Sequence, residues 1–296
     1  MQSKPFADQL PDLFVPKPVS KGFIAFAIRH PTMSFGALLL VLMLLMALFA
    51  PWLGTIDPTE LAPVKRTREP SAEHWFGTDA VGRDIYSRVL YGARVSLLVG
   101  FSVAVLASLA GLIIGLLSGF LRKVDGVLMR VMDGMMSIPP VLLAIALMAL
   151  TRASVENVIM AITLAEIPRV SRLVRGVVLS LREQPYVDAA VTAGTSTLTI
   201  IVKHILPNTL APLTVQATYI CASAMITESI LSFIGAGTPP IIPSWGNIMA
   251  DGRTLFQVKA YIIFFPAVFL SITVLAVNLL GDGLRDALDP RKAKIS

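Results

Sequence analysis

Three long stretches of this 296-residue chain carry no charged side chain. They run Met33–Leu53, Val95–Leu121 and Ala260–Gly281. Each holds the roughly 20 mainly apolar residues that a helix needs to cross the ~30 Å hydrocarbon core of a bilayer. Charged residues make up only 15% of the chain, whereas soluble proteins carry about 25%. The sequence therefore predicts an all-α integral membrane protein and argues against a soluble globular domain.

Three further segments are apolar but shorter or interrupted. Gly134–Thr151 contains Pro139-Pro140, which should kink or break a helix near its start because proline lacks a backbone donor. Asn157–Ala165 is short, so a crossing there has to extend to about Pro168. Ile205–Thr227 is uncharged and is followed by a glutamate. Together with the three long stretches, these segments predict six transmembrane helices.

The placement of basic residues predicts the orientation of these six spans. If the N-terminus lies inside, most of the 25 Lys and Arg residues fall in the inside loops, as expected for cytoplasmic segments. The same distribution explains why the chain has more Lys and Arg than Asp and Glu, so the excess does not point to nucleic-acid binding. Both termini are predicted to be cytoplasmic, with the first span as an uncleaved anchor. The predicted regions are a cytoplasmic segment 1–32, the first transmembrane helix 33–53, an extracytoplasmic loop 54–92, a transmembrane domain 93–281 with a cytoplasmic loop 169–204, and a cytoplasmic tail 282–296.

Charged residues of the extracytoplasmic loop follow a simple alternation. Asp79 and Asp84 alternate with Arg83 and Arg88, which favours a solvated amphipathic helix over a catalytic pair of carboxylates. A single imidazole in this loop, His74, is expected to be an ordinary surface histidine, because no second or third metal ligand accompanies it.

Three glycines of the second span recur every four residues, at Gly111, Gly115 and Gly119. Small residues at this spacing line one face of a helix and allow a second helix to approach closely. The alternative is that these glycines face lipid and are tolerated there without packing against another helix. The spacing indicates a helix bundle and says nothing about a substrate.

Few ionisable residues lie within or beside the predicted spans. Arg130 and Asp133 are three residues apart, which places them on one helical face and predicts a structural ion pair. Glu166 is expected at the membrane interface beside Arg169. Glu228 lies deeper, where a carboxylate should face protein or water rather than lipid. It either lines a translocation path or closes a hydrogen bond between helices.

The polar insert between the fourth and fifth spans has strong local signals. Pro185 suits the first turn of a helix, and Tyr186–Ala193 is predicted to form a short helix that stops at Gly194. Ser196 can cap a second helix, which is expected to run until Pro207. Such an element could dock into a groove on a cytoplasmic partner or lie on the lipid headgroups.

The same insert resembles the EAA signature of ABC-importer permease subunits. The match consists of Asp188-Ala189-Ala190, three residues, Gly194, nine residues, and His204-Ile205-Leu206-Pro207. Asp188 stands where glutamate is usual and His204 where isoleucine is usual, while the glycine and proline keep their spacing. In that family the loop holds the coupling helix, seated on the ATP-hydrolysing subunit. The resemblance assigns an ATPase-coupling role to Tyr186, Asp188, Ala189, Ala190, Gly194, His204, Leu206 and Pro207.

Two other stretches narrow the resemblance. Phe76-Gly77-Thr78-Asp79 with Gly82-Arg83-Asp84, and Leu231–Gly237 followed by Pro243-Ser244-Trp245-Gly246, resemble the C-type permease of dipeptide, oligopeptide and nickel importers. The resemblance implies a six-helix type I ABC importer permease in a bacterial inner membrane. It further implies a second homologous permease of the B-type, two cytoplasmic ATPases and a periplasmic or lipid-anchored substrate-binding protein. Peptides are the favoured substrate, with nickel and oligosaccharides as alternatives.

Several chemistries lack the residues that they need. No lysine follows a glycine, so the chain has no G-x-x-x-x-G-K-[ST] phosphate loop. One cysteine and three scattered histidines provide neither a disulfide framework nor a metal cluster, and no nucleophile–base pair can be assembled. We expect a non-enzymatic subunit without its own cofactor, with ATP and Mg²⁺ bound by partner ATPases. An ion-driven secondary transporter and a purely structural membrane subunit remain as alternatives.

Overall fold

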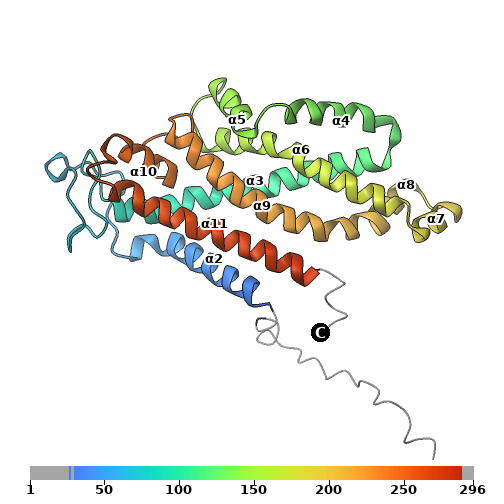
Figure 1. Cartoon of the computed structure of the whole chain (residues 1–296), viewed down its shortest axis with the longest axis horizontal. Coiled ribbons are helices and arrows are strands. Elements are labelled where there is room, and N and C mark those ends of the chain that lie inside the picture. Colours follow the sequence, from blue (N-terminus) through green and yellow to red (C-terminus); the bar gives the residue numbers. More distant parts are fainter. Residues whose placement is uncertain (1–26, 28–29, 289–296) are drawn as a thin grey trace, which may run out of the picture.

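A computed structural model describes Ala27 and residues 30–288 of the chain (Figure 1). Its helices are α2 (Pro31–Phe49), α3 (Ile85–Phe120), α4 (Arg122–Met136), α5 (Pro140–Ala149), α6 (Val155–Arg182), α7 (Pro185–Thr192), α8 (Thr197–Ile200), α9 (Leu206–Phe233), α10 (Trp245–Gly252) and α11 (Tyr261–Leu288). Short helical turns are η2 (Ala50–Trp52), η3 (Pro63–Lys65), η4 (Ile201–Ile205) and η5 (Arg253–Leu255). Extended pairing in the described residues is limited to one bridge between Thr78 and Asp84. The all-α prediction is confirmed. The segment 1–32 and the tail 282–296 lie partly outside the described residues.

Four helical units are long and apolar enough to cross a membrane within the described residues. They are Pro31–Trp52, Ile85–Phe120, Thr197–Phe233 and Tyr261–Leu288. The pair α4 and α5 would be a fifth crossing if the two helices count as one span, because they pass the same test together but are bent by 87°. The expected remaining span, α6, has 28 residues but carries several arginines in its second half. The helix break predicted at Pro139-Pro140 coincides with the 87° bend between α4 and α5.

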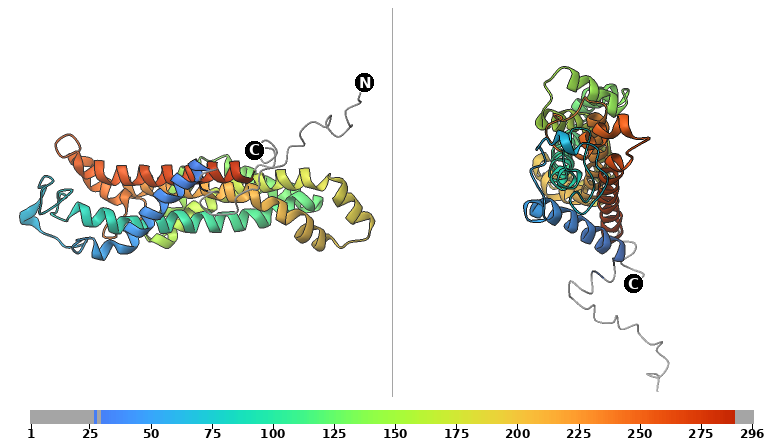
Figure 2. Two further views of the ribbon diagram at one scale, coloured as in Figure 1. Left: turned by 90° about the horizontal axis from the view of Figure 1, so that it is seen from below. Right: turned by 90° about the vertical axis from the view of Figure 1, so that its left-hand side faces the viewer.

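The bundle is elongated, with irregular structure concentrated at its two ends (Figures 1 and 2). The loop after α2 and the short helix α10 lie at one end, and α7 with α8 lies at the other. Helices α2 and α11 pack side by side. A Cβ on Gly36 would lie 2.7 Å from the backbone nitrogen of Leu280, so this contact requires glycine. The elements that the sequence placed on opposite sides of the membrane therefore lie at opposite ends of the bundle.

The three periodic glycines of α3 form its contact with α6. An added Cβ on Gly115 would lie 2.6 Å from Cβ of Val174. Gly111 and Gly119 meet Val170 and Val178 in the same way. Valines spaced by four residues therefore fit against glycines spaced by four residues, which brings the two backbones close together. The predicted helix-packing face is confirmed.

We expect Gly115→Ala to lower the thermal unfolding midpoint of the purified protein. The new methyl group forces Val174 or its backbone to move, and such overpacking costs about 1–3 kcal/mol. Gly176→Ala is the matched control, because no atom lies within 4 Å of its added Cβ. Replacing that exposed helical glycine should raise stability by about 0.5–1 kcal/mol. Equal unfolding midpoints for the two variants would contradict the close packing of α3 against α6.

Two helix ends differ from the sequence prediction. The polar insert was expected to begin at Arg169, but α6 continues through Pro168 and ends only at Arg182. Two arginines of this part of α6 pair with α4: Arg172 with Asp133 at 2.6 Å and Arg175 with Asp125 at 2.6 Å. The second helix was expected to end at Pro207, but α8, η4 and α9 form one continuous helix. The π-helical turn of η4 precedes the proline and accommodates its ring and missing donor.

Candidate functional site

The α7–α8 element at one end of the bundle has the local structure that its sequence predicts. Pro185 lies in the first turn of α7, and Gly194 has a φ of +75°. The Gly194 N–H donates to the Val191 carbonyl at 3.0 Å, and the Thr195 N–H donates to the Ala190 carbonyl at 3.0 Å. The Ser196 hydroxyl caps α8 by accepting from the Thr199 N–H at 3.4 Å. The predicted short helix, glycine stop and second cap are confirmed.

Helix α7 is anchored to the bundle on one side while its outer face stays open. Val187 is 1% exposed, whereas Tyr186, Asp188 and Ala189 are exposed and Ala190 is half-buried. Helix α7 is thus held to the bundle by Val187 and by the partly buried Ala190, while a carboxylate and an aromatic ring stay exposed.

The second half of the predicted coupling signature lies close to the first half. The ring of His204 in η4 lies 6.2 Å from the ring of Tyr186, measured between centroids. Ile205 is fully buried, Leu206 is half-buried and Pro207 is exposed. The fold therefore gathers the signature residues of both segments at one end of the bundle.

At the opposite end, four charged residues form a compact cluster. Asp79 Oδ2 accepts from Arg83 Nε and from Arg88 Nη1, both at 2.6 Å. Asp251 Oδ2, at the end of α10, accepts from Arg83 Nη2 and Arg88 Nη1, both at 2.7 Å. Arg88 is 1% exposed and Asp79 is fully buried. The cluster joins the loop before α3, the first turn of α3 and α10.

The expected solvated amphipathic helix over this segment is therefore wrong. Residues 76–84 form turns, in which Gly77 and Gly82 have φ values of +79° and +88°. Helix α3 begins only at Ile85, where the Asp84 carboxylate accepts from the Ser87 N–H at 2.8 Å. Helix α3 therefore begins ten residues before the expected start of its span at Val95. The predicted boundary between the extracytoplasmic loop 54–92 and the transmembrane domain 93–281 falls inside this helix. The alternating charges are buried because α10 supplies Asp251 as a further partner.

His74 also differs from its prediction as a surface histidine. It is 5% exposed, and its Nδ1 lies 2.9 Å from Asp84 Oδ1. The neighbouring carboxylate of Glu73 is exposed, and a hydrogen bond from Lys65 at 2.5 Å lowers its pKa below the ordinary value. The loop thus contains both a buried polar core and an exposed ion pair.

Glu228 on α9 is fully buried within a group of hydroxyl side chains. Ser232 Oγ donates to Glu228 Oε1 at 2.8 Å, and Ser96 Oγ from α3 lies 3.5 Å from Oε2. The Asn247 amide of α10 extends the network by donating to the Thr238 hydroxyl at 2.9 Å. Of the two sequence-based alternatives, this geometry corresponds to a hydrogen bond between helices.

We expect Glu228→Gln to unfold close to the wild-type midpoint, because the amide oxygen can still accept from Ser232. Glu228→Leu removes that acceptor and leaves buried hydroxyl groups unsatisfied, at a cost of about 1–3 kcal/mol. Thermal unfolding in detergent measures both. A Gln variant as unstable as the Leu variant would show that the hydrogen bonds are not what matters.

The predicted pair between Arg130 and Asp133 is wrong. Asp133 Oδ1 accepts from Arg172 of α6 at 2.6 Å, since the acidic face of α4 packs towards α6, while Arg130 is exposed. Glu166 lies 3.3 Å from Arg169, as expected, and it is 3% exposed. Its second partner is Ser223 on α9, at 3.4 Å.

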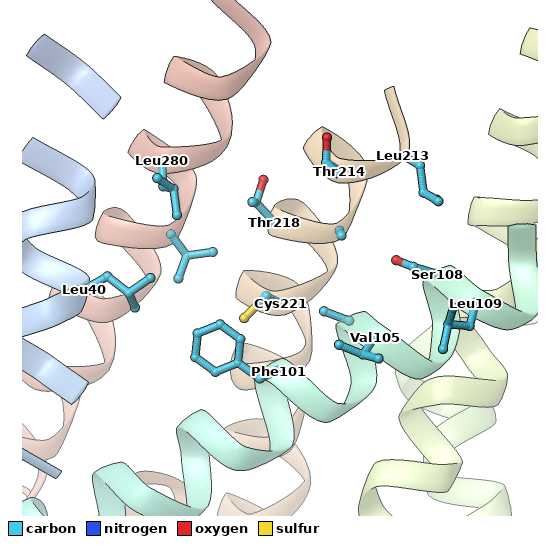
Figure 3. Close-up of a pocket in the computed structure, with 13 residues that line it drawn as sticks. Leu40, Phe101, Val105, Ser108, Leu109, Leu213, Thr214, Thr218, Cys221 and Leu280 are labelled. Carbon is cyan, nitrogen blue, oxygen red and sulfur yellow. The ribbon is translucent and has the colours of Figure 1, made fainter. Parts of the chain in front are cut away.

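A cavity of about 330 Å³ lies between α2, α3, α9 and α11 (Figure 3). Its wall is mainly apolar, with Phe101 and the buried Cys221 near its centre. The hydroxyl groups of Thr214 and Thr218 donate to carbonyls of their own helix at 2.8 and 2.7 Å. The lining includes no charged side chain. In the described residues no group of three or more His, Cys, Asp or Glu side chains could hold a metal ion.

The apolar helices, with an exposed short helix at one end and a structured loop at the other, define a protein built to span a membrane. The family model of the binding-protein-dependent transport system inner membrane component matches residues 107–294. The chain belongs to this family.

Similar proteins of known type cover nearly the whole chain. A probable peptide ABC transporter permease protein of Sinorhizobium fredii is 50% identical over 92% of this chain and 93% of its own length. The dipeptide transport system permease protein DppC of Alkalihalophilus pseudofirmus is 42% identical, covering 86% and 84%. The oligopeptide transport system permease protein OppC of Bacillus subtilis is 40% identical, covering 88% and 85%.

A solved structure supports the fold independently. A chain of the inward-facing MetNI methionine ABC transporter superposes with a TM-score of 0.58 at 21% identity, covering 68% of this chain and 96% of that chain. The type I importer permease fold is therefore shown.

Proposed function

We propose that this chain is the pore-forming permease subunit of an ABC importer that moves peptides across a bacterial inner membrane. The observation that carries the proposal is the 40–50% identity to relatives named for peptide transport, over nearly the whole chain. The docking geometry of α7 supports the permease role, because it is an exposed helix anchored to the bundle by Val187 and Ala190.

The proposed complex contains three further kinds of partner. A second homologous permease pairs with this chain, so that substrate passes between the two bundles. Two cytoplasmic ATPases bind ATP and Mg²⁺ and seat the coupling element, with the exposed Tyr186, Asp188 and Ala189 facing the ATPase and Ala190 supporting α7 from the bundle side. A periplasmic or lipid-anchored binding protein delivers substrate to the opposite end. ATP binding then favours one of two arrangements of the paired permease bundles. Switching between these arrangements opens the pathway to one side of the membrane at a time, which is the alternating-access mechanism.

The orientation follows from the same assignment. If α7 meets the ATPases, both termini are cytoplasmic and the Asp79–Arg88 cluster is extracytoplasmic. Gly194, His204, Leu206 and Pro207 then set the direction in which α7 leaves the bundle. The chain itself catalyses no reaction and needs no cofactor of its own.

Uptake of a labelled dipeptide, in cells with and without this chain, tests the proposal. We expect deletion to abolish uptake, and unlabelled peptides alone to compete in the wild type. Unchanged dipeptide uptake with a defect in nickel or disaccharide uptake would keep the permease and overturn the substrate. Normal uptake of dipeptide, nickel and disaccharide in cells that lack this chain would favour a purely structural subunit.

A further inference from the structure

The outward side of α4 carries three cations at helical spacing. Arg122, Lys123 and Arg130 are exposed and line a surface cavity of about 370 Å³ together with Gly126, Val127 and Val131. Residues four apart lie on the same helical face, so these six residues form one strip. We call them the basic face of α4. The strip runs from Arg122 to Val131, which is about 14 Å along the helix.

Both acidic residues of α4 form ion pairs with arginines of α6. Asp125 accepts two hydrogen bonds from Arg175, at 2.6 and 2.7 Å. Asp133 accepts from Arg172 at 2.6 Å. Among the described residues, Arg122, Lys123 and Arg130 take part in no ion pair. The helix therefore presents its uncompensated positive charge outward.

The basic face begins near the end of the bundle that holds α7 and runs back along α4 (Figure 1). Helix α4 starts directly after α3 ends at Phe120, and a cavity of about 320 Å³ brings Arg122 and Arg182 beside Asp188 of α7. In the proposed orientation this end meets the cytoplasmic surface of the membrane. Basic residues there attract anionic lipid headgroups, while Val127 and Val131 beside them offer an apolar surface to acyl chains.

We propose that the basic face of α4 binds an anionic phospholipid of the inner leaflet. The phosphate group lies between Arg122, Lys123 and Arg130, and the first acyl carbons pack on Val127 and Val131. Gly126 leaves room for the headgroup, because no atom lies within 4 Å of the position that a Cβ would take there. The inference depends on the proposed orientation of the chain and goes beyond its transport role. It does not depend on which solute is transported.

Lipid binding to the purified, assembled complex tests this site. Native mass spectrometry counts bound phosphatidylglycerol, with phosphatidylcholine of the same chain length and inorganic phosphate as comparison probes. We expect the wild type to bind phosphatidylglycerol in preference to phosphatidylcholine. The triple variant Arg122→Gln, Lys123→Gln, Arg130→Gln should lose roughly fivefold in affinity per removed cation.

A charge-matched variant controls for net charge. Arg152→Gln, Arg253→Gln, Arg285→Gln also removes three exposed cations, but from other parts of the chain, and should bind as the wild type does. Equal loss in both variants, or equal binding of the two lipids by the wild type, would overturn the site. Competition by inorganic phosphate at the same concentration would overturn the lipid assignment. Absence of binding in the assembled complex, but not in the isolated chain, would show that a protein partner covers this face.

These readouts stay separate from the proposed function. Lipid binding without peptide uptake would refute the substrate and retain the lipid site. Peptide uptake without selective lipid binding would do the reverse. The wild-type comparison of the two lipids needs no variant, so the site remains testable even if the triple variant fails to fold.

Discussion

Gly194→Pro will abolish peptide uptake while the protein still reaches the membrane. Gly194 has a φ of +75°, whereas proline is fixed near −65° and lacks the N–H that here donates to Val191 at 3.0 Å. The turn cannot form, so α7 leaves the bundle in another direction and no longer meets the ATPases. Uptake of labelled dipeptide at equal membrane abundance measures the effect.

Gly194→Asn is the matched control, because asparagine tolerates the left-handed conformation and keeps its N–H. It should retain most of the uptake. Replacing Asp188-Ala189-Ala190 with bulky basic residues should abolish uptake, since Asp188 and Ala189 are exposed on α7 and the half-buried Ala190 packs against the bundle. Wild-type uptake in the proline variant would remove the coupling role of this element.

Arg88→Met will destabilise the protein strongly. Arg88 Nη1 bridges Asp79 at 2.6 Å and Asp251 at 2.7 Å, and methionine leaves the buried Asp79 carboxylate with Arg83 as its one remaining ion-pair partner among the described residues. Removing one partner of a buried ion pair costs about 3–5 kcal/mol. The thermal unfolding midpoint in detergent should fall accordingly, and α10 should become more susceptible to proteolysis.

A second substitution separates charge from packing. Asp79→Asn combined with Arg88→Met should recover part of the loss, because the buried negative charge disappears together with its partner. Glu73→Gln breaks the exposed pair with Lys65 and should leave the midpoint unchanged, as is usual for surface ion pairs. An Arg88→Met protein as stable as the wild type would show that the cluster does not hold this end together.

Short-range signals explain what could be predicted from the sequence. The helix start at Pro185, the stop at Gly194 and the cap at Ser196 depend on neighbouring residues alone. The glycine face of α3 is equally local, because its four-residue period is visible along the helix. The long uncharged stretches indicate membrane helices without reference to any partner. These elements are placed correctly for that reason.

Long-range partners explain what could not be predicted. Asp79 and Arg88 look solvated in sequence, since Asp251, the residue that completes their cluster, is 163 residues from Arg88 along the chain. Asp133 has a plausible partner three residues away, yet Arg172 of another helix takes its place. One local signal was available at the loop: Asp84 is a good N-cap residue and stands eleven positions before Val95, where the uncharged stretch begins. That signal would have started α3 at Ile85.

Peptide transport by the purified complex in proteoliposomes tests the central claim most directly. The account predicts that peptide accumulates only when ATP, the binding protein and this chain are all present, and that vanadate stops it. Gly194→Pro in the same preparation should leave the complex unable to accumulate peptide. Accumulation that is insensitive to vanadate and follows an imposed ion gradient would contradict the account and identify an ion-driven transporter instead.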